Sequence, residues 1–468
     1  MQLGDLLDDL TLDARTGSVE VRDVQIDSRE CGPGSLFFAL PGTSAHGAAF
    51  AHDAVDRGAV AIVTSEPIAT DVPVVVVPAS QLRALVAEAS AALVGHPEFG
   101  VELVGVTGTN GKTTVTSIVA DLSRAIEWNG ASVGTLTQER TTPAGPELYR
   151  IIRHLVDGFD ARRPRSVIAV EVSSHALDQG RVDGLRFAVA VFTNLSHEHL
   201  DYHETMEQYF KTKAALFTPE RAQRAVVWGD DEHGSRLASL TSLPVTLVGR
   251  HDARDVVTSL LGTTFFWRDQ LVSTPLVGGY NVDNALIAMT VLAALGAPDD
   301  DVAWGMANVA TVPGRFEVVA AGAVTVIVDY AHTPDGLRRL LGDVRALAPL
   351  ARVATVFGCG GDRDREKRPA MGTAATALSD LTVVTSDNPR TEAPGVIIDA
   401  VMTGADPGAT VWRVEDRREA IGDALRWARP GDVVVIAGKG HETNQIFADR
   451  NVPFDDRVVA RELLGSTC

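Results

Sequence analysis

Short runs of apolar, mostly β-branched residues alternate with Ala- and Leu-rich stretches of helical length along almost the whole chain. Near-continuous apolar runs of this kind predict parallel strands whose two faces are both covered. Because such strands are separated by helices, the pattern indicates an α/β fold rather than a β-sandwich. We expect strands at residues 60–64, 166–170, 189–192, 324–328, 353–357 and 433–437.

The length and charge of the chain narrow the class of protein further. Its 468 residues correspond to roughly three domains of about 150 residues each. The 42 Lys and Arg residues stand against 61 Asp and Glu residues, which gives a net charge of −19. This excess argues against binding to the backbone of nucleic acids or to an anionic membrane, but it is compatible with a local basic pocket.

The cysteine content and the N-terminal segment predict a cytoplasmic protein without a membrane span. Cys31, Cys359 and Cys468 lie far apart in sequence, so we expect neither a disulfide framework nor a Cys-rich zinc site. The first residues lack the basic start and the long apolar stretch of a signal peptide. The most apolar run, at residues 72–78, is far shorter than the roughly 18 residues that a membrane-spanning helix needs.

Two segments rich in Gly and Pro predict domain boundaries. Residues 95–100 follow a helical stretch and precede an apolar strand. Residues 311–315 also follow a helical stretch, and they precede the series of strands in the last third of the chain. Dividing the chain there gives domains at residues 1–98, 99–313 and 314–468, all of ordinary domain size.

The motif with the clearest chemistry is GTNGKTT at residues 108–114, between an apolar strand and a helical stretch. Glycines allow backbone N–H groups to converge on phosphates, and the helix N-terminus adds its positive end. Lys112 can reach the β- and γ-phosphates, and the hydroxyl of Thr113 can bind Mg²⁺. The strict G-x-x-x-x-G-K-[ST] pattern fails at one position, because residue 106 is Val. The strand, loop and helix together still predict nucleotide binding.

Acidic and imidazole side chains follow the next predicted strands. Glu171 comes at the end of a buried strand, where a carboxylate is costly unless it is paired or binds a metal, so we interpret it as a Mg²⁺ ligand. Three histidines and two acidic residues lie within residues 192–203. The spacing of His199 and His203 resembles a zinc site, but the H-E-x-x-H pattern is absent, and Mg²⁺ beside ATP is the simpler expectation.

Three charged loops follow predicted strands in the last third of the chain. They are GCGGDRD at residues 358–364, TSDNPR at residues 385–390 and GKGHE at residues 438–442. Ligands of open α/β sheets bind at the carboxyl ends of the strands, so we expect these loops to line one cleft. Their mixed charges favour an ionic substrate.

On these motifs the chain resembles the Mur ligase family, the ATP-dependent amide-forming enzymes of peptidoglycan synthesis, and within it the UDP-N-acetylmuramoyl-tripeptide synthetases. The resemblance implies an α/β fold of three domains: an N-terminal UDP-substrate domain, a central P-loop ATPase domain and a C-terminal, Rossmann-like domain for the amino acid. The matching segments follow the family's order through nearly the whole chain: residues 27–29, 108–114, 141–143, 171–177, 180–184, 193–195, 199–201, 209–217, 281, 284, 313–315, 329–335, 358–364, 387–390 and 438–442.

The resemblance also implies a reaction. ATP, UDP-MurNAc-L-Ala-D-Glu and meso-2,6-diaminopimelate are the expected small-molecule partners, with Mg²⁺ as cofactor and no nucleic acid. A carboxylate is a poor electrophile, so its oxygen first attacks the γ-phosphoryl group to form an acyl phosphate. The amine of the amino acid then attacks the acyl carbon, and phosphate leaves.

The site residues implied by the resemblance fall into five sets. The catalytic set is Lys112, Glu171, His199 and Lys213. The metal set is Thr113 and Glu171 for a first Mg²⁺, with His199 and a carbamylated Lys213 (N6-carboxylysine) for a second. The ATP-binding set is Gly108, Thr109, Asn110, Gly111, Lys112, Thr113, Thr114, Asn281, Asn284 and Arg315, and Asp329 and His332 are expected in the same cleft. The UDP-substrate set is Ser28, Thr43, Ser44, Ala45, Thr141, Thr142, Ser173, Gln179 and Arg181. The amino-acid set is Arg363, Asp387, Asn388, Pro389, Arg390, Gly438 and Glu442.

In the family that the chain resembles, the Asp-Asn-Pro-Arg motif distinguishes enzymes that add different amino acids. It accompanies meso-diaminopimelate, whereas relatives that add lysine carry another residue in place of the Arg. Physical chemistry favours the same choice, because a guanidinium such as that of Arg390 binds a second carboxylate bidentately. The chain departs from the family pattern at Glu198, where Asp is usual, and in a shortened segment at residues 136–140.

Three alternatives stay open from the sequence. The first is the lysine-adding form of the same enzyme. The second is another ligase of the superfamily, such as a folylpolyglutamate synthetase. The third is a nucleotide-dependent switch that hydrolyses ATP without ligation. ADP release measured with and without the UDP-dipeptide and an amino acid separates these alternatives.

Overall fold

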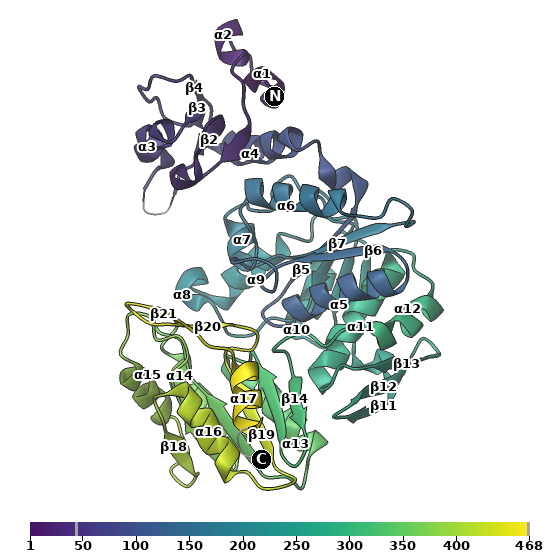
Figure 1. Ribbon diagram of the computed structural model, residues 1–468. Helices are drawn as coiled ribbons and strands as arrows, with labels where there is room; N and C mark the ends of the chain where they lie inside the picture. Colours follow the sequence, from purple (N-terminus) through teal and green to yellow (C-terminus); the bar gives the residue numbers. More distant parts are fainter. Residues whose placement is uncertain (43–44, 466–468) are drawn as a thin grey trace.

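The structure is a computed structural model that describes residues 1–42 and 45–465. Three α/β units follow one another along the molecule, with the N-terminal unit at one end and the C-terminal unit at the other (Figure 1). This arrangement confirms the predicted α/β fold of three domains. All six predicted strands are present, with ends that differ by at most one residue from those expected. No helix of the described residues is long and apolar enough to cross a membrane.

The N-terminal unit is a parallel sheet with the strand order β1-β2-β3-β4. Successive residues of β2 pack on opposite faces, because Leu36 and Phe38 belong to one apolar cluster and Phe37 and Ala39 to another. Both faces are therefore covered by helices. The elements are β1 (Asp23–Gln25), β2 (Ser35–Ala39), β3 (Ala59–Thr64), β4 (Val74–Val76), α1 (Leu3–Leu6), α2 (Ala14–Gly17), α3 (Ala51–Asp56) and α4 (Ala79–Leu93).

The central unit contains a parallel six-stranded sheet with the order β10-β9-β8-β5-β7-β6 and a small antiparallel sheet, β11-β12-β13. In β7, Val167 and Ala169 pack toward α5 and α11, whereas Ile168 and Val170 pack toward α6. The strands are β5 (Glu102–Thr107), β6 (Asn129–Val133), β7 (Ser166–Glu171), β8 (Val189–Phe192), β9 (Ala225–Trp228), β10 (Val245–Val248), β11 (Arg254–Ser259), β12 (Gly262–Trp267) and β13 (Gln270–Thr274). The helices are α5 (Lys112–Ala125), α6 (Gly145–Asp157), α7 (Ser174–Asp178), α8 (Leu200–His203), α9 (Met206–Ala214), α10 (Glu232–Leu240), α11 (Gly279–Ala294) and α12 (Asp299–Gly305).

The C-terminal unit contains a second six-stranded sheet, with the order β14-β15-β19-β16-β17-β18. Only β14 runs antiparallel to its neighbour. The strands are β14 (Glu317–Ala321), β15 (Thr325–Asp329), β16 (Val353–Phe357), β17 (Leu381–Val384), β18 (Val411–Arg413) and β19 (Val433–Ala437), and β20 (Asn444–Ile446) pairs with β21 (Asn451–Pro453) in a separate hairpin. The helices are α13 (Pro334–Leu347), α14 (Lys367–Leu378), α15 (Pro394–Met402), α16 (Arg417–Trp427) and α17 (Asp456–Gly465).

In both large sheets the order in which successive strands are added reverses, and a strand beside that point leads into a predicted functional loop. In the central sheet β5 lies between β7 and β8, and in the C-terminal sheet β19 returns between β15 and β16. Ligands of open α/β sheets bind where the winding reverses, outside the carboxyl ends of the strands. The fold therefore predicts binding sites at the loops after β5 and β19.

Candidate active site

A cleft of about 690 Å³ opens between the central and C-terminal units. It is lined by loops that follow strands of both sheets, including those after β5, β7, β8, β15, β16, β17 and β19. The three charged loops of the last third of the chain all contribute, which confirms that they share one cleft.

The Gly-rich loop after β5 is held by the residues that follow β8. The backbone N–H of Thr109 donates to the carbonyl of Asn194 at 2.8 Å, and the hydroxyl of Thr193 donates to the carbonyl of Asn110 at 2.6 Å. Gly108 has a φ of +149°, and a Cβ at this position would lie 1.9 Å from Thr193 Oγ1, so only glycine fits. The loop is therefore fixed before the helix begins.

Lys112 begins helix α5 and curls back over this loop. Its Nζ donates to the carbonyls of Gly108 and Thr109 at 2.9 and 2.8 Å. Burial lowers the pKa of Lys112, while the negative charges of Glu171 and Glu198 oppose that shift. A helix N-terminus and an ammonium group are suited to bind phosphate groups.

Glu171 ends strand β7 and is almost completely buried. Its carboxylate accepts the hydroxyl of Thr113 at 2.9 Å and the backbone N–H of Thr135 at 2.8 Å. Burial raises the pKa of Glu171, although the positive charge of Lys112 and these hydrogen bonds oppose the shift. A buried carboxylate beside a hydroxyl at the end of the phosphate loop is a suitable pair of hard oxygen ligands for Mg²⁺.

His199 and Lys213 lie near the other side of the phosphate loop. Burial lowers the pKa of His199 to about 4, so the imidazole is neutral at neutral pH and able to bind a metal. Lys213 is 1% exposed, and its Nζ donates to the carbonyl of Gly108 at 2.8 Å and lies 4.6 Å from the ring centre of Tyr209. Burial and the charge of Lys112 hold the pKa of Lys213 well below its ordinary value.

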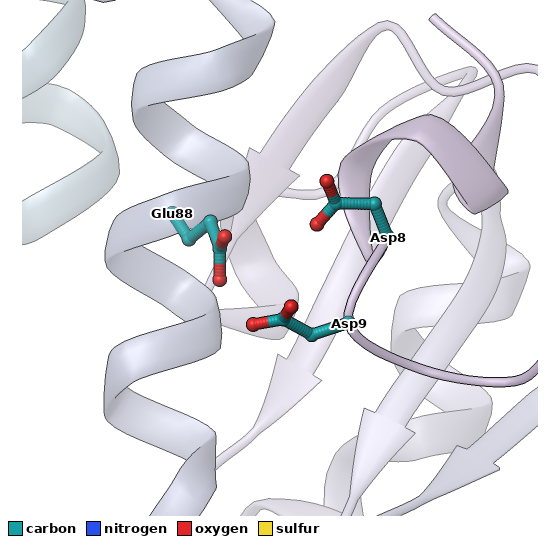
Figure 2. A group of neighbouring side chains, drawn as sticks. All are labelled: Asp8, Asp9 and Glu88. Atoms are coloured by element: carbon teal, nitrogen blue, oxygen red, sulfur yellow. The ribbon is translucent and has the colours of Figure 1, made fainter.

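An acidic group in the N-terminal unit lies apart from this cleft. Asp8, Asp9 and Glu88 place carboxylate oxygens within 4.8 Å of one another at the surface (Figure 2), and they form the only group of three or more His, Cys, Asp or Glu side chains at that spacing among the side chains that the structure describes. Burial and its two acidic neighbours raise the pKa of Glu88. Exposed carboxylates gather in this way without a metal, and we assign none here.

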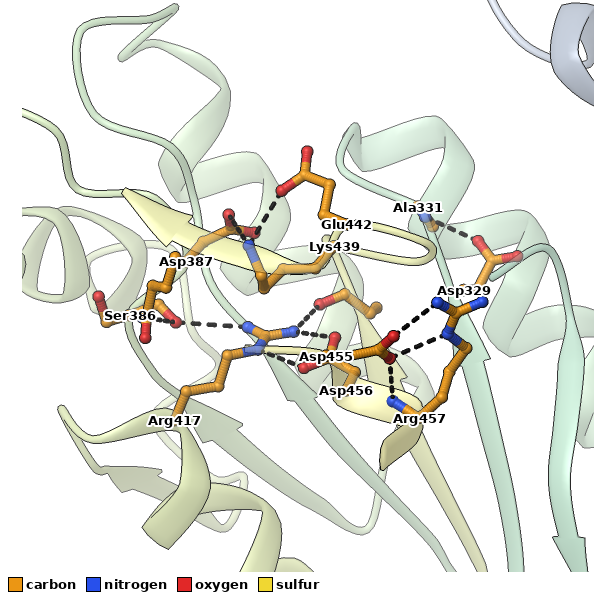
Figure 3. A network of polar contacts seen from close by, with 12 residues as sticks. Asp329, Ala331, Ser386, Asp387, Arg417, Lys439, Glu442, Asp455, Asp456 and Arg457 are labelled. Carbon is orange, nitrogen blue, oxygen red and sulfur yellow. Dashed lines mark hydrogen bonds and ion pairs between the residues drawn. The ribbon is translucent and has the colours of Figure 1, made fainter. Parts of the chain in front are cut away.

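The C-terminal side of the cleft contains a network of buried charges (Figure 3). The Nζ of Lys439 donates to Glu442 Oε2 at 2.9 Å and to Asn388 Oδ1 at 3.1 Å, and it lies 4.0 Å from Asp387 Oδ1. The amide of Asn388 donates to Glu442 Oε2 at 2.7 Å. Gly438, with a φ of +110°, permits this approach, because a Cβ there would lie 2.7 Å from Asp387 Oδ2.

Arg390 and Asp387 present unused polar atoms to the cleft. Arg390 Nη1 donates to the carbonyls of Gly361 at 2.8 Å and Asn388 at 3.4 Å, and no carboxylate of the described residues forms an ion pair with its guanidinium. The Asp387 carboxylate accepts no hydrogen bond from the part of the chain that the structure describes. Both groups line the cleft. A ligand with one carboxylate and one ammonium group suits this pair.

Three contacts join the two sides of the cleft. His332 Nε2 lies 2.9 Å from Glu198 Oε1, and the Arg315 guanidinium donates to the hydroxyl of Thr113 at 3.2 Å. The hydroxyl of Tyr280, in α11, donates to Asp329 Oδ2 at 2.7 Å. Asp329 and His332 line the cleft as expected.

Comparisons with known proteins cover nearly all of the chain. Family models described as Mur ligase family, catalytic domain, Mur ligase middle domain, and Mur ligase, glutamate ligase domain match residues 20–100, 106–292 and 314–440. A UDP-N-acetylmuramoyl-L-alanyl-D-glutamate--2,6-diaminopimelate ligase of Geobacillus thermodenitrificans is 42% identical over 96% of this chain and 95% of the relative. The chain belongs to the Mur ligase family.

Solved structures of Mur ligases share the fold. A UDP-N-acetylmuramoyl-L-alanyl-D-glutamate--2,6-diaminopimelate ligase matches with a TM-score of 0.70 and 30% identity, over 100% of this chain and 99% of that one. A MurF ligase from Thermotoga maritima in complex with ADP matches with a TM-score of 0.64 and 19% identity, over 95% and 97% of the two chains. The second match concerns the fold alone.

The cleft of this Mur ligase brings together most of the site residues expected from the sequence. Those that line it are Thr109, Asn110, Gly111, Lys112, Thr113, Thr114, Thr141, Thr142, Glu171, Ser173, Arg181, His199, Asn284, Arg315, Arg363, Asp387, Asn388, Arg390, Gly438 and Glu442. Those that do not line it are Ser28, Ala45, Gly108, Gln179, Lys213, Asn281 and Pro389. Thr43 and Ser44 lie outside the described residues.

Some site residues of this Mur ligase were not predicted. Thr135, which holds Glu171, lies just before the shortened segment, and Arg140, at the end of that segment, lines the cleft. Lys439 is part of a motif recognised in the sequence, yet nothing in the sequence shows that its side chain is buried among acceptor groups. Glu198, noted only as a departure from the family, makes the contact with His332.

Proposed function

We propose that this chain is an ATP-dependent ligase that joins meso-2,6-diaminopimelate to UDP-MurNAc-L-Ala-D-Glu in peptidoglycan precursor synthesis. The observation that carries the proposal is a single cleft lined by a phosphate-binding loop on one side and by the Asp387, Asn388, Arg390 and Glu442 groups on the other. The names of the 42% identical relative and of the 30% identical solved structure support the same reaction.

The first step is phosphoryl transfer to the carboxylate of the D-Glu residue. A carboxylate oxygen attacks the γ-phosphorus, the bond to the β-phosphate oxygen breaks, and ADP and an acyl phosphate form. Such transfers depend mainly on positioning and charge stabilisation. Lys112 and the N-terminus of α5 supply positive charge at the phosphates, and Arg315 extends toward Thr113 from the other side of the cleft.

The residues around Glu171 fit a Mg²⁺ ion. Thr113 and Glu171 offer a hydroxyl and a buried carboxylate whose cost of burial a cation would offset. His199 offers a neutral nitrogen for a second ion. When bound beside ATP, Mg²⁺ neutralises the negative charge of the phosphates.

We propose that carbamylated Lys213 supplies an anionic ligand for the second ion. A lysine with a lowered pKa has a free lone pair on Nζ. This nitrogen attacks CO₂, one proton leaves, and the buried amine becomes an anionic carbamate.

The second chemical step takes place on the C-terminal side of the cleft. The amine of diaminopimelate attacks the acyl carbon, and phosphate leaves as the amide forms. Arg390 has Nε and Nη2 available for the distal carboxylate of the amino acid. Asp387 is placed to accept from an ammonium group, and Arg363 and Gly438 complete the pocket.

The UDP-substrate is assigned to the part of the same cleft that is lined by Thr142, Ser173 and Arg181 of the central unit. Thr142, Ser173 and Arg181 are joined by hydrogen bonds, with Arg181 Nη1 donating to the carbonyl of Thr142 at 2.8 Å. Residues 1–98, 99–313 and 314–468 are proposed as the UDP-substrate, ATP-binding and amino-acid-binding domains. We place the reaction in the cytoplasm because it consumes ATP.

Measurement of ligation tests the proposed function. Purified protein with ATP, Mg²⁺ and UDP-MurNAc-L-Ala-D-Glu is expected to release ADP and form the UDP-tripeptide only when meso-diaminopimelate is present. ADP release that does not depend on an amino acid would instead indicate a nucleotide switch. Equal use of L-lysine would contradict the assigned amino acid, and use of a folate substrate would contradict the assigned enzyme.

A further inference from the structure

Lys439 is a completely buried lysine beneath the proposed amino-acid pocket. Besides its contacts with Asn388 and Glu442, its Nζ donates to the carbonyl of Asn444 at 2.7 Å, which ties it to the β20–β21 hairpin. Asp387, Asn388 and Glu442 line the cleft, whereas Lys439 does not. The lysine therefore contacts the groups that face the ligand without facing the ligand itself.

The three charged groups of this layer carry a net negative charge. One ammonium, on Lys439, stands against two carboxylates, on Asp387 and Glu442, so that the three groups sum to +1 − 2 = −1. Below them Arg417 and Asp456 form a neutral pair in which both side chains are completely buried, with Nε and Nη2 each 2.8 Å from a carboxylate oxygen. Arg417 also donates to the carbonyl of Ala437 at 2.9 Å, at the end of β19.

We propose that Lys439 is a positioning residue that keeps Asp387 and Glu442 ionised and in place, so that the pocket selects an amino acid by its ammonium group. This inference rests on the proposed function, because it assigns the ammonium-binding part of the amino-acid site. Without the lysine, two carboxylates at the bottom of a cleft would repel each other and take up protons. They would then no longer attract an ammonium group.

The electrostatic balance agrees with this role. Burial raises the pKa of Glu442, but the charge and hydrogen bond of Lys439, with smaller contributions from Asn388 and His441, bring the pKa below its ordinary value. Burial also raises the pKa of Asp387, and the charges of Lys439 and Arg417 oppose that shift. The other charged or titratable groups that act on the two carboxylates or respond to them are Asp456, His441, Tyr330 and Cys359.

The experiment compares Lys439→Met with wild type and with Lys211→Met, which changes an exposed lysine of α9 outside the cleft. KM for meso-diaminopimelate and KM for ATP are measured in the ligation assay from pH 6.5 to 8.5. At pH 7 the KM for diaminopimelate is expected to rise at least about tenfold in Lys439→Met, as for a buried charge pair that loses one partner. KM for ATP should change less than twofold, and Lys211→Met should match wild type.

The pH dependence of KM shows whether Lys439 acts through its charge or only through packing. Protonated carboxyls ionise as the pH rises, so the ratio of the variant's KM to that of wild type should fall toward pH 8.5. Lys439→Arg, which keeps the positive charge, should recover part of the affinity. If Lys439→Met does not fold, Lys439→Gln, which keeps hydrogen bonding but removes the charge, provides the same comparison.

Two results would overturn the inference. One is a folded Lys439→Met or Lys439→Gln enzyme whose KM for diaminopimelate at pH 7 stays within twofold of wild type. The other is a raised KM whose ratio to wild type is constant over the pH range, since only a structural role behaves in this way. Absence of diaminopimelate ligation in the wild-type protein would instead refute the proposed function, which keeps the two failures distinct.

Discussion

Replacement of Arg390 is the sharpest test of amino-acid selection. The side chain lines the cleft, and its Nη1 is held by the carbonyls of Gly361 and Asn388. Nε and Nη2 form no hydrogen bond with the described residues, so one edge of the planar guanidinium is free to bind a carboxylate with two parallel hydrogen bonds. Arg390→Ala removes this edge, and Arg390→Lys keeps the charge but not the fork.

The size of the effect follows from the loss of one partner of a buried charge pair, which costs about 2–5 kcal/mol. At about 1.4 kcal/mol per factor of ten, kcat/KM for meso-diaminopimelate should fall roughly 30-fold to several thousand-fold. L-Lysine lacks the distal carboxylate, so its kcat/KM should change little. The preference of wild type for diaminopimelate over lysine should therefore collapse in Arg390→Ala and shrink in Arg390→Lys.

The assay is amide formation at saturating ATP and UDP-dipeptide, with each amino acid varied in turn. Arg426→Ala is the matched control, because it removes an exposed arginine of α16 outside the cleft. An Arg390→Ala enzyme that loses diaminopimelate and lysine activity by the same factor would refute carboxylate recognition by this residue.

Three further predictions concern the metal ligands and the core. Lys213→Ala should nearly abolish ligation, and short carboxylic acids should partly restore it; an active enzyme whose Lys213 carries no carbamate in carbon-13 labelling would contradict this expectation. Thr113→Val, which removes the hydroxyl 2.9 Å from Glu171, should raise the Mg²⁺ concentration needed for half-maximal activity at least about tenfold, and an unchanged Mg²⁺ titration would exclude Thr113 as a ligand. Ile421→Ala, at a completely buried position of α16, should lower the free energy of unfolding by about 2–5 kcal/mol in urea denaturation, whereas Val458→Ala, at a position that is 47% exposed, should change it by less than about 0.5 kcal/mol.

The sequence predicted the parts of the fold that have long apolar runs. The strands that were not expected include three-residue edge strands, such as β1, β4 and β18, and strands with alternating burial, such as β12, but also the completely buried β2 and β9. A three-residue strand is too short to show a period, and the antiparallel pairing of β14 depends on its neighbour rather than on its own residues. The sequence therefore indicated the fold class and the order of the domains better than it indicated the strands at the edges of each sheet.

The candidate site could likewise be predicted only in part. Motifs at strand ends identified loops that do meet, because parallel strands bring their carboxyl ends to one edge. The burial of Lys439 and the contact between Glu198 and His332 were not predictable, because each depends on how separate segments pack together. Such contacts have no spacing rule in the sequence.

The position of β19 has a consequence for how the protein is made. This strand pairs with β15 on one side and β16 on the other, although it follows both by more than seventy residues in the chain. During synthesis the two earlier strands keep unpaired edges until β19 has been made, and exposed edges of this kind invite pairing between molecules. A chain that stops before Val433 would keep the complete phosphate loop yet leave the C-terminal sheet split into two parts. Termination before Val433 should therefore produce aggregation rather than a shorter, partly active enzyme.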